Sequence, residues 1–156
     1  MAQAELVWQS ELVTEPVGEM ELLRLWIGRQ LGPRRPEMWR PWVRLLEPLR
    51  GVSSARTGAP EPFEVPAGFV YDQASAPWFA VPIVSPTGRY LREASCLHDM
   101  RCPWGPVAHP ARGETLTPLQ AANELRAGML AKGAARWRSN LVRWAVLNFG
   151  PGWEQA

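Results

Sequence analysis

The chain is poor in cysteine and in long apolar runs, and each shortage argues against a class of protein. Its two cysteines, Cys96 and Cys102, would stand about 9 Å apart along a helix, too far for a disulfide. We therefore expect no disulfide framework, and a reducing compartment fits. No apolar run approaches the roughly 20 residues that span a bilayer, so no transmembrane segment is expected. No basic-then-apolar leader opens the chain, so no secretion signal is expected either.

A strong charge of one sign is also missing. The 156 residues include 17 basic and 15 acidic side chains, a net charge of +2. So weak a balance does not favour nucleic acid or an anionic surface as the main partner. Lys132 is the only lysine. We attribute the excess of arginine to codon bias, the alternative being bidentate pairing of guanidinium groups with carboxylates.

The N-terminal part, residues 1–62, gives weak signals. Its apolar cluster at residues 22–27 fits neither a helical nor a strand period cleanly, and we interpret it as short strands. Pro41 and Pro48 require any strand between them to be short or at an edge. The stretch from 51 to 62, rich in small residues and proline, predicts a surface loop.

A strand and a helix are predicted in the middle of the chain. Apolar residues alternate over Phe63 to Tyr71, which predicts one strand that ends just before Asp72 and Ser75. After a proline-rich loop, a helix is predicted over residues 89–101, with Pro103 stopping it.

Two capped helices are predicted at the end of the chain. Thr117 is the N-cap of the first, with Pro118 at the first helical position and Gln120 completing a capping box. This helix is predicted to end at Gly133, and the last to run over residues 134–149. The predicted fold class is α+β, with a small N-terminal β region followed by a helical C-terminal half.

The candidate site is the pair His98 and Asp99 in the last turns of the first predicted helix. Leu91, Ala94 and His98 share one face at i, i+3 and i+7, so burial of the first two would turn His98 toward the interior. Asp99 would then point to the flank, where the loop that carries Asp72 could approach.

Side chains in this arrangement could activate a water and hold a cation. His98 would take the proton, Asp99 and Asp72 would bind the cation, and Ser75 is a further polar residue of the loop. A third group should orient the imidazole through its other N–H. Asn123, flanked by alanines on the helix that starts at Thr117, is the candidate for that role.

A purely structural interpretation stays open. A histidine at a helix end is often a packed, hydrogen-bonded residue, and Asp99 could pair with Arg92, Arg101 or Arg112. The pair would then belong to a buried polar network.

A zinc site is another open interpretation. His98 and Cys102 stand at i and i+4, with Cys96 and His109 nearby. The spacing from Cys96 to His109, however, matches no compact metal module.

An ordered set of residues between 65 and 99 has the character of a family signature. Its members are Val65-Pro66-Ala67-Gly68-Phe69, Asp72, Ala74-Ser75, Pro77, Gly88, Tyr90 and His98-Asp99. In order and spacing this set resembles a small phage and prophage family described as a domain of unknown function, number 1353. The resemblance covers about residues 63–150, the family core, within one domain that spans residues 1–156. It implies other phage proteins or further copies of the chain as partners, and the bacterial host cytoplasm or the virion as location.

The order of these residues is also similar to the phospholipase A2 arrangement. That similarity implies His98 as general base, Asp99 as a ligand of a calcium cofactor, and Asn123 in the orienting position. Where the family carries Ala-Asp, this chain has Ala122-Asn123. An amide cannot stabilise an imidazolium as a carboxylate does, so a base mechanism would be impaired.

The last predicted helix carries two tryptophans on one face. Trp137, Leu141, Trp144, Ala145 and Asn148 share that face, with arginines on the others. We expect it to pack on the core with partial exposure to a partner, the alternative being an interfacial membrane helix.

The sequence thus favours a phage-encoded structural or accessory protein, associated with the virion or tail, in which His98 and Asp99 belong to a polar network. The alternative is a small metal-assisted hydrolase, acting on lipid or cell-wall bonds, with His98 as general base. No nucleic acid partner is expected.

Overall fold

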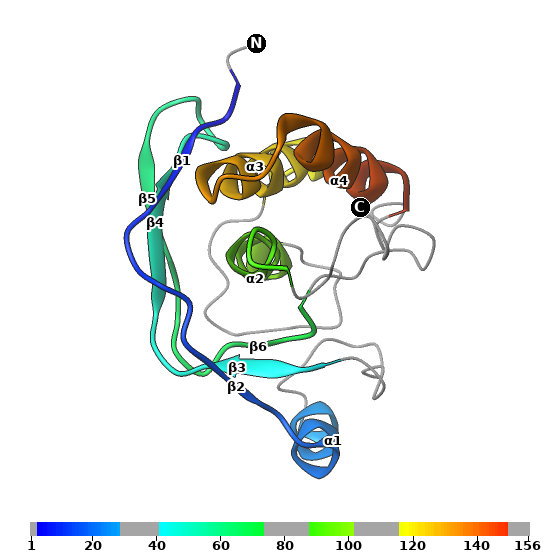
Figure 1. Ribbon diagram of the computed structural model, residues 1–156. Coiled ribbons are helices and arrows are strands. Elements are labelled where there is room, and N and C mark those ends of the chain that lie inside the picture. The colour runs from blue at the N-terminus through cyan, green and yellow to red at the C-terminus, as the bar shows by residue number, and fades with distance from the viewer. Residues whose placement is uncertain (1–2, 29–40, 74–87, 102–115, 150–156) are drawn as a thin grey trace.

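The computed structural model describes residues 3–28, 41–73, 88–101 and 116–149, and its fold is α+β, as predicted. Strands occupy the N-terminal half, and three of the four described helices lie in the C-terminal half (Figure 1). The elements are β1 (Leu6–Trp8), β2 (Thr14–Pro16), α1 (Glu19–Ile27), β3 (Val43–Leu45), β4 (Leu49–Ser53), β5 (Glu61–Val65), β6 (Val70–Tyr71), α2 (Arg92–Arg101), α3 (Pro118–Ala131) and α4 (Arg136–Phe149).

The strands form one three-stranded antiparallel layer that bends at a corner. One sheet has the order β1-β4-β5 and the other β2-β3-β6. Along the chain β1 leads to β2, β3 to β4 and β5 to β6, and the two members of each pair take the same place in their sheets. Figure 1 shows the result as an L, with α2 lying in the angle between the two arms.

The corner between β5 and β6 corrects the prediction of a single strand over Phe63 to Tyr71. Pro66 has no N–H to give to a ladder, and Gly68 has φ +86°, a left-handed conformation that suits glycine. The Gly68 N–H donates to the carbonyl of Leu45 at 2.7 Å, which fixes the turn. The strand therefore changes sheets here, although it still ends just before Asp72, as predicted.

The segment read as short strands at residues 22–27 is a helix, so that prediction was wrong. Leu22 is buried, and Leu25 and Trp26 pack against the same core cluster at i+3 and i+4. This is helical spacing, obscured in the sequence by the apolar residues on the outer face, of which Ile27 is exposed.

The predicted surface loop from 51 to 62 was too long. β4 continues to Ser53 and β5 begins at Glu61, so the connection covers only residues 54–60. Gly51 lies inside β4 because a side chain there would collide with the ring of Phe63 and the carbonyl of Val7. A glycine in this stretch thus fills a tight place in a strand and does not mark a turn.

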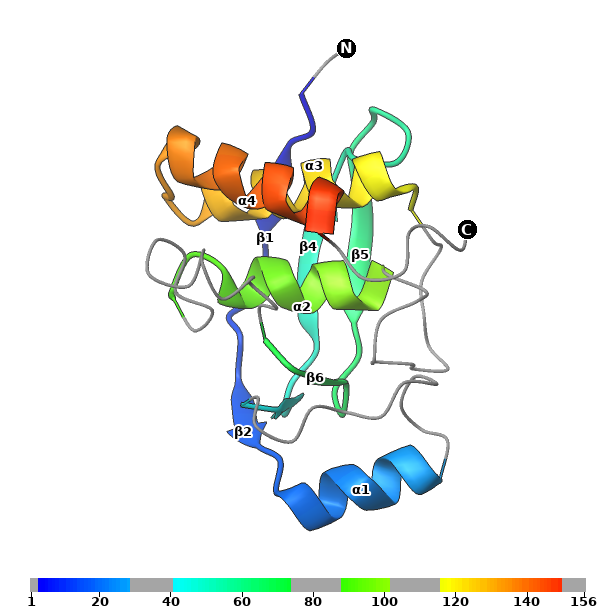
Figure 2. The ribbon, with the colours of Figure 1, turned by 90° about the vertical axis from the view of Figure 1, so that its right-hand side faces the viewer.

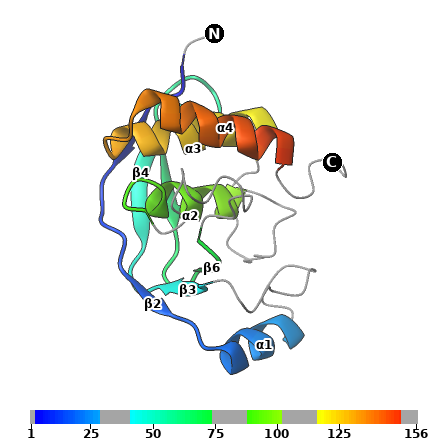
Figure 3. The ribbon, with the colours of Figure 1, turned by 45° about the vertical axis from the view of Figure 1, so that its right-hand side comes forward.

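The C-terminal helices follow their local signals. Thr117 caps α3 with both hydrogen bonds of the capping box, and Pro118 is the first helical residue. Gly133 follows α3 with φ +89°. α4 begins at Arg136, two residues after the start predicted from the sequence. Figures 2 and 3 show α3 and α4 stacked beyond α2, with α1 at the opposite end of the molecule. None of the described helices is both long and apolar enough to cross a membrane.

Two apolar clusters hold these layers together. The larger joins the strands to α1 and α2, and the smaller joins α2, α3 and α4. Trp8 contacts both clusters, and its indole N–H donates to the carbonyl of Gly128 at 3.1 Å. The ring of Trp8 also meets that of Phe63 edge-on, with centroids 5.7 Å apart. One side chain thus ties the first strand to α3.

Candidate functional site

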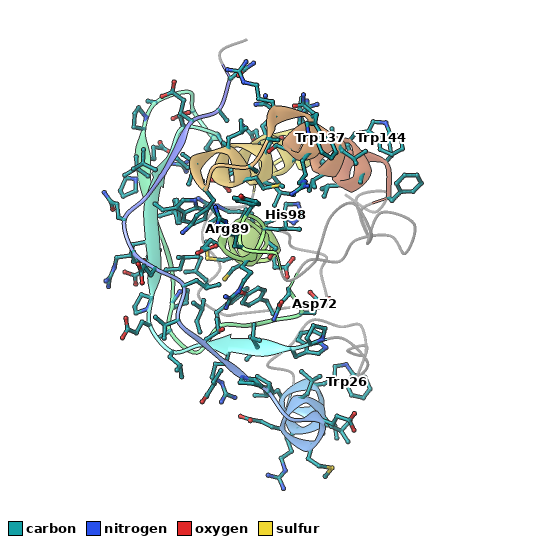
Figure 4. All side chains as sticks on the ribbon, viewed as in Figure 1. Trp26, Asp72, Arg89, His98, Trp137 and Trp144 are labelled. Atoms are coloured by element: carbon teal, nitrogen blue, oxygen red, sulfur yellow. The ribbon has the colours of Figure 1, made fainter. Side chains whose placement is uncertain are left out.

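α2 presents His98 and Asp99 in its last turns, as predicted. Leu91 and Ala94, which share a face with His98, are both buried. Figure 4 shows His98 on the side of α2 that faces α3 and α4, and Asp72 on the other side, at the end of β6. The helix therefore separates His98 from Asp72, and the two do not converge on one point.

Burial removes the charge of His98. Its side chain is 14% exposed, and this burial lowers the pKa of the imidazole to about 4. His98 is therefore neutral at neutral pH. Its Nδ1 lies 3.9 Å from Oδ1 of Asp99, which is too long for a hydrogen bond. The contact is a proximity of a neutral ring and a carboxylate rather than an ion pair.

Asp99 acts electrostatically on a buried phenol and a buried thiol. Burial raises the pKa of the Tyr71 hydroxyl, and the neighbouring Cys96 and Asp99 raise it further. Burial likewise raises the pKa of the Cys96 thiol, with Asp99 and then Glu93 adding to the effect. Both groups are protonated at neutral pH, so neither is an activated nucleophile.

The end of β6 has an unusual backbone. Tyr71, Asp72 and Gln73 are all buried, and Gln73 has φ +60°, a left-handed conformation that is uncommon outside glycine. Within the described part of the chain, the Tyr71 hydroxyl and Oε1 of Gln73 have no hydrogen-bond partner. Buried polar atoms of this kind accept or donate to water or a ligand when one is present.

Asn123, the predicted orienting group, is bonded to α4. Its Oδ1 accepts a hydrogen bond of 2.6 Å from Nε of Arg143. The amide oxygen is thus held by a cation, and the role toward His98 stays a prediction. Ser75 lies outside the described residues.

The arginines that were candidates to pair with Asp99 have other contacts. Arg101 donates to Oε2 of Glu124 at 3.2 Å, and Arg92 donates to Oγ1 of Thr14 at 3.3 Å. Arg112 falls outside the described residues. The pair of Arg101 and Glu124 was missed by the sequence analysis, because its members are 23 residues apart and nothing local marks them as partners.

The zinc interpretation gains no support. Cys102 and His109 lie outside the described residues, and Cys96 is fully buried. Among the residues the structure describes, no group of three or more histidine, cysteine, aspartate or glutamate side chains is arranged to hold a metal ion.

Comparison with known proteins gives a match to a family model. A family model described as "Protein of unknown function (DUF1353)" matches residues 44–146. That range extends the predicted family core toward the N-terminus, into β3 and β4. Searches of curated proteins and of solved structures found no match.

Proposed function

The chain belongs to the DUF1353 family of proteins of unknown function, and we propose for it the role of a non-catalytic structural or accessory protein that acts by binding other proteins. As a finer proposal, it is phage-encoded and works in the virion or tail, or in the host cytoplasm during assembly. The support for this phage context is the resemblance of its residues 63–150 to a phage and prophage family.

The state of His98 carries the proposal. A general base works best with a pKa near the working pH, and the pKa of His98 lies near 4. At neutral pH such an imidazole is a weak base. A hydrolase of the predicted type also needs base and cation ligand around one point, whereas His98 and Asp72 lie on opposite sides of α2 (Figure 4). A buried, neutral histidine in a polar network fits a packing role better.

The alternative is a metal-assisted hydrolase with Asp99 and Asp72 as calcium ligands, and one observation favours it. The left-handed backbone of Gln73 directly after Asp72 is the kind of strain that occurs at functional sites. The buried amide oxygen of Gln73 would add a neutral ligand of the type that calcium accepts.

Thermal melting with added metal separates the two proposals. Calcium or zinc chloride is titrated into the wild type, His98→Ala, Asp99→Asn and the control Glu47→Gln, whose carboxylate is exposed on the surface. We expect no rise in Tm with either ion, and we expect His98→Ala to lower Tm by roughly 5 °C or more, because it empties a packed position. A calcium-dependent rise that is lost in Asp99→Asn and kept in Glu47→Gln would overturn the non-catalytic proposal.

A further inference from the structure

The outer surface of α4 carries two tryptophans that the fold leaves in solvent. Trp137 is 58% exposed and Trp144 is 48% exposed, whereas the buried face of the helix consists of Ser139, Val142 and Ala145. Figure 4 shows both tryptophans on α4, at the end of the molecule opposite α1. The expected core packing therefore holds for Ala145, and the two indoles are about half free.

The spacing of this exposed ridge is that of a helix–helix contact. Trp137, Leu141 and Trp144 stand at i, i+4 and i+7, so they form a row along the axis of α4 about 10 Å long. Leu141, the middle residue of the row, is half-buried and packs partly against the smaller apolar cluster. A row with this period fits into the groove of a second helix.

Among the residues the structure describes, the arginines around the ridge have no carboxylate partner. α4 contains no aspartate or glutamate. Arg143 donates to Asn123 and Arg126 donates to Asn140, both neutral amides, and Arg138 stacks over the ring of Trp137.

Arg136 is exposed at the start of α4, and the described residues offer it no carboxylate either. Within the described part of the chain, four positive charges thus lie on this surface without a carboxylate beside them. The strand half of the molecule is different, because Arg44, Arg50 and Arg56 each pair with glutamates.

Two of the four guanidinium groups are also held in place. Arg126 and Arg143 each donate through Nε, at 2.6 Å. Their paired terminal amino groups, which form the fork that binds a carboxylate, make no bond within the described residues. Positioned donors lose little side-chain entropy when a carboxylate arrives.

We propose that this face, made of Trp137, Leu141, Trp144 and the arginines at 126, 136, 138 and 143, binds an acidic amphipathic helix of a partner protein. The positive charge of the arginines requires a negatively charged partner. The helical spacing of the ridge favours a partner that is itself a helix. Tryptophan and arginine are the side chains most enriched where binding energy concentrates at protein interfaces. The inference rests on the proposed function and names the chemistry of the partner.

A lipid surface fits the face less well. An interfacial helix inserts a broad apolar face, and the apolar face of α4 with Val142 and Ala145 is already used by the core. The test must therefore distinguish binding of an acidic helix from binding of anionic lipid. It must also distinguish it from binding of single-stranded nucleic acid, which can contact arginine and exposed aromatic rings.

The test uses a fluorescent peptide of about three heptads with leucine at two positions per heptad and glutamate on its other faces. Its binding to the full chain is followed by fluorescence anisotropy. A matched peptide carries lysine in place of glutamate. Phosphatidylglycerol–phosphatidylcholine vesicles and an oligothymidylate are measured in parallel.

We expect the glutamate peptide to bind, the lysine peptide not to bind, and added salt to weaken binding. Trp144→Ala should weaken binding by about tenfold or more and Arg136→Glu several-fold. Two controls should leave it unchanged. Met20→Ala removes an exposed apolar side chain on α1, and Arg50→Glu makes the same charge change on the strand half.

Equal binding of both peptides, or no binding of the glutamate peptide, would overturn the inference. So would tighter binding to vesicles or oligothymidylate that depends on Trp144 and Arg136. None of these outcomes bears on the metal response of His98 and Asp99. Failure of this inference is thus distinguishable from failure of the proposed function.

Discussion

His98 shows how burial of one residue contributes to the pH dependence of stability. Its pKa is near 4 in the folded protein and near 6.5 in an unperturbed chain, so the folded state binds the proton less readily. The free energy of unfolding should therefore fall as pH drops through the window from 6.5 to 4. The loss from this group is on the order of 3 kcal/mol.

Urea unfolding of the wild type and of His98→Gln at several pH values in that window checks this. Glutamine does not titrate, so the variant should lack this share of the loss, and the wild type should lose stability relative to it as pH falls. Parallel curves for the two proteins would contradict the prediction.

A second residue-scale prediction concerns the buried pair of Arg101 and Glu124. The carboxylate of Glu124 is 2% exposed, and burial raises its pKa even though Arg101 opposes this shift. Arg101→Met leaves that carboxylate without its guanidinium partner, so we expect a loss of about 3–5 kcal/mol in the free energy of unfolding.

The double variant Arg101→Met with Glu124→Leu should recover much of that loss, because it removes both charges. Urea denaturation of the two single variants and the double variant measures the coupling. Additive losses would show that the two side chains do not depend on each other.

At the scale of elements, the junction of α3 and α4 depends on Gly133. Its φ of +89° is a conformation that strains any residue with a Cβ, although the nearest atom to an added Cβ, on Tyr90, is 4.0 Å away. Gly133→Ala should therefore cost roughly 1 kcal/mol of stability through backbone strain alone. Gly133→Asn should cost less, because asparagine tolerates this region better. Thermal melting of both variants tests the order, and an equal or larger loss for asparagine would contradict it.

The elements that the sequence predicted well are those with contiguous local signals. Thr117, Pro118 and Gln120 lie within four residues and mark the start of α3 without any tertiary information. α1 has no such mark, because Gly18 at its N-cap offers no side chain and no side-chain hydrogen bond caps it. Whether this segment is a helix or a strand depends on which of its apolar residues contact the core. Elements distant in sequence decide those contacts.

The site divides in the same way. His98, Asp99 and Asp72 could be chosen from the sequence because of their chemical type and order. The buried phenol and thiol beside Asp99 could not, because Tyr71 and Cys96 come from different elements. Pro66 and Gly68 already marked the corner between β5 and β6 within the alternating stretch that ends in Tyr71. The period of the apolar residues alone, however, does not distinguish a bent strand from a straight one.

For the molecule as a whole, Trp8 is the joint between the strands and the helical layer. It contacts both apolar clusters, donates to Gly128, and lies 5.7 Å from Nζ of Lys132. Trp8→Ala should cost about 3–5 kcal/mol, because it opens a cavity between two layers.

Trp144→Ala is the matched control, since that ring is about half exposed and lies outside both clusters. It should change stability by only about 0.5 kcal/mol. Urea denaturation of both variants provides the comparison. Similar losses would mean that Trp8 does not join the layers.

Three separate strand crossings hold the angle around α2 in the L-shaped strand layer. Each of its three strands turns the corner in a separate stretch of chain, at residues 9–13, 46–48 and 66–69. A substitution that straightens one crossing leaves the other two to hold the arms apart, and the ladders between neighbouring strands oppose the change. The position of α2, and with it the surroundings of His98, should therefore be kept when a substitution alters any one of the three crossings.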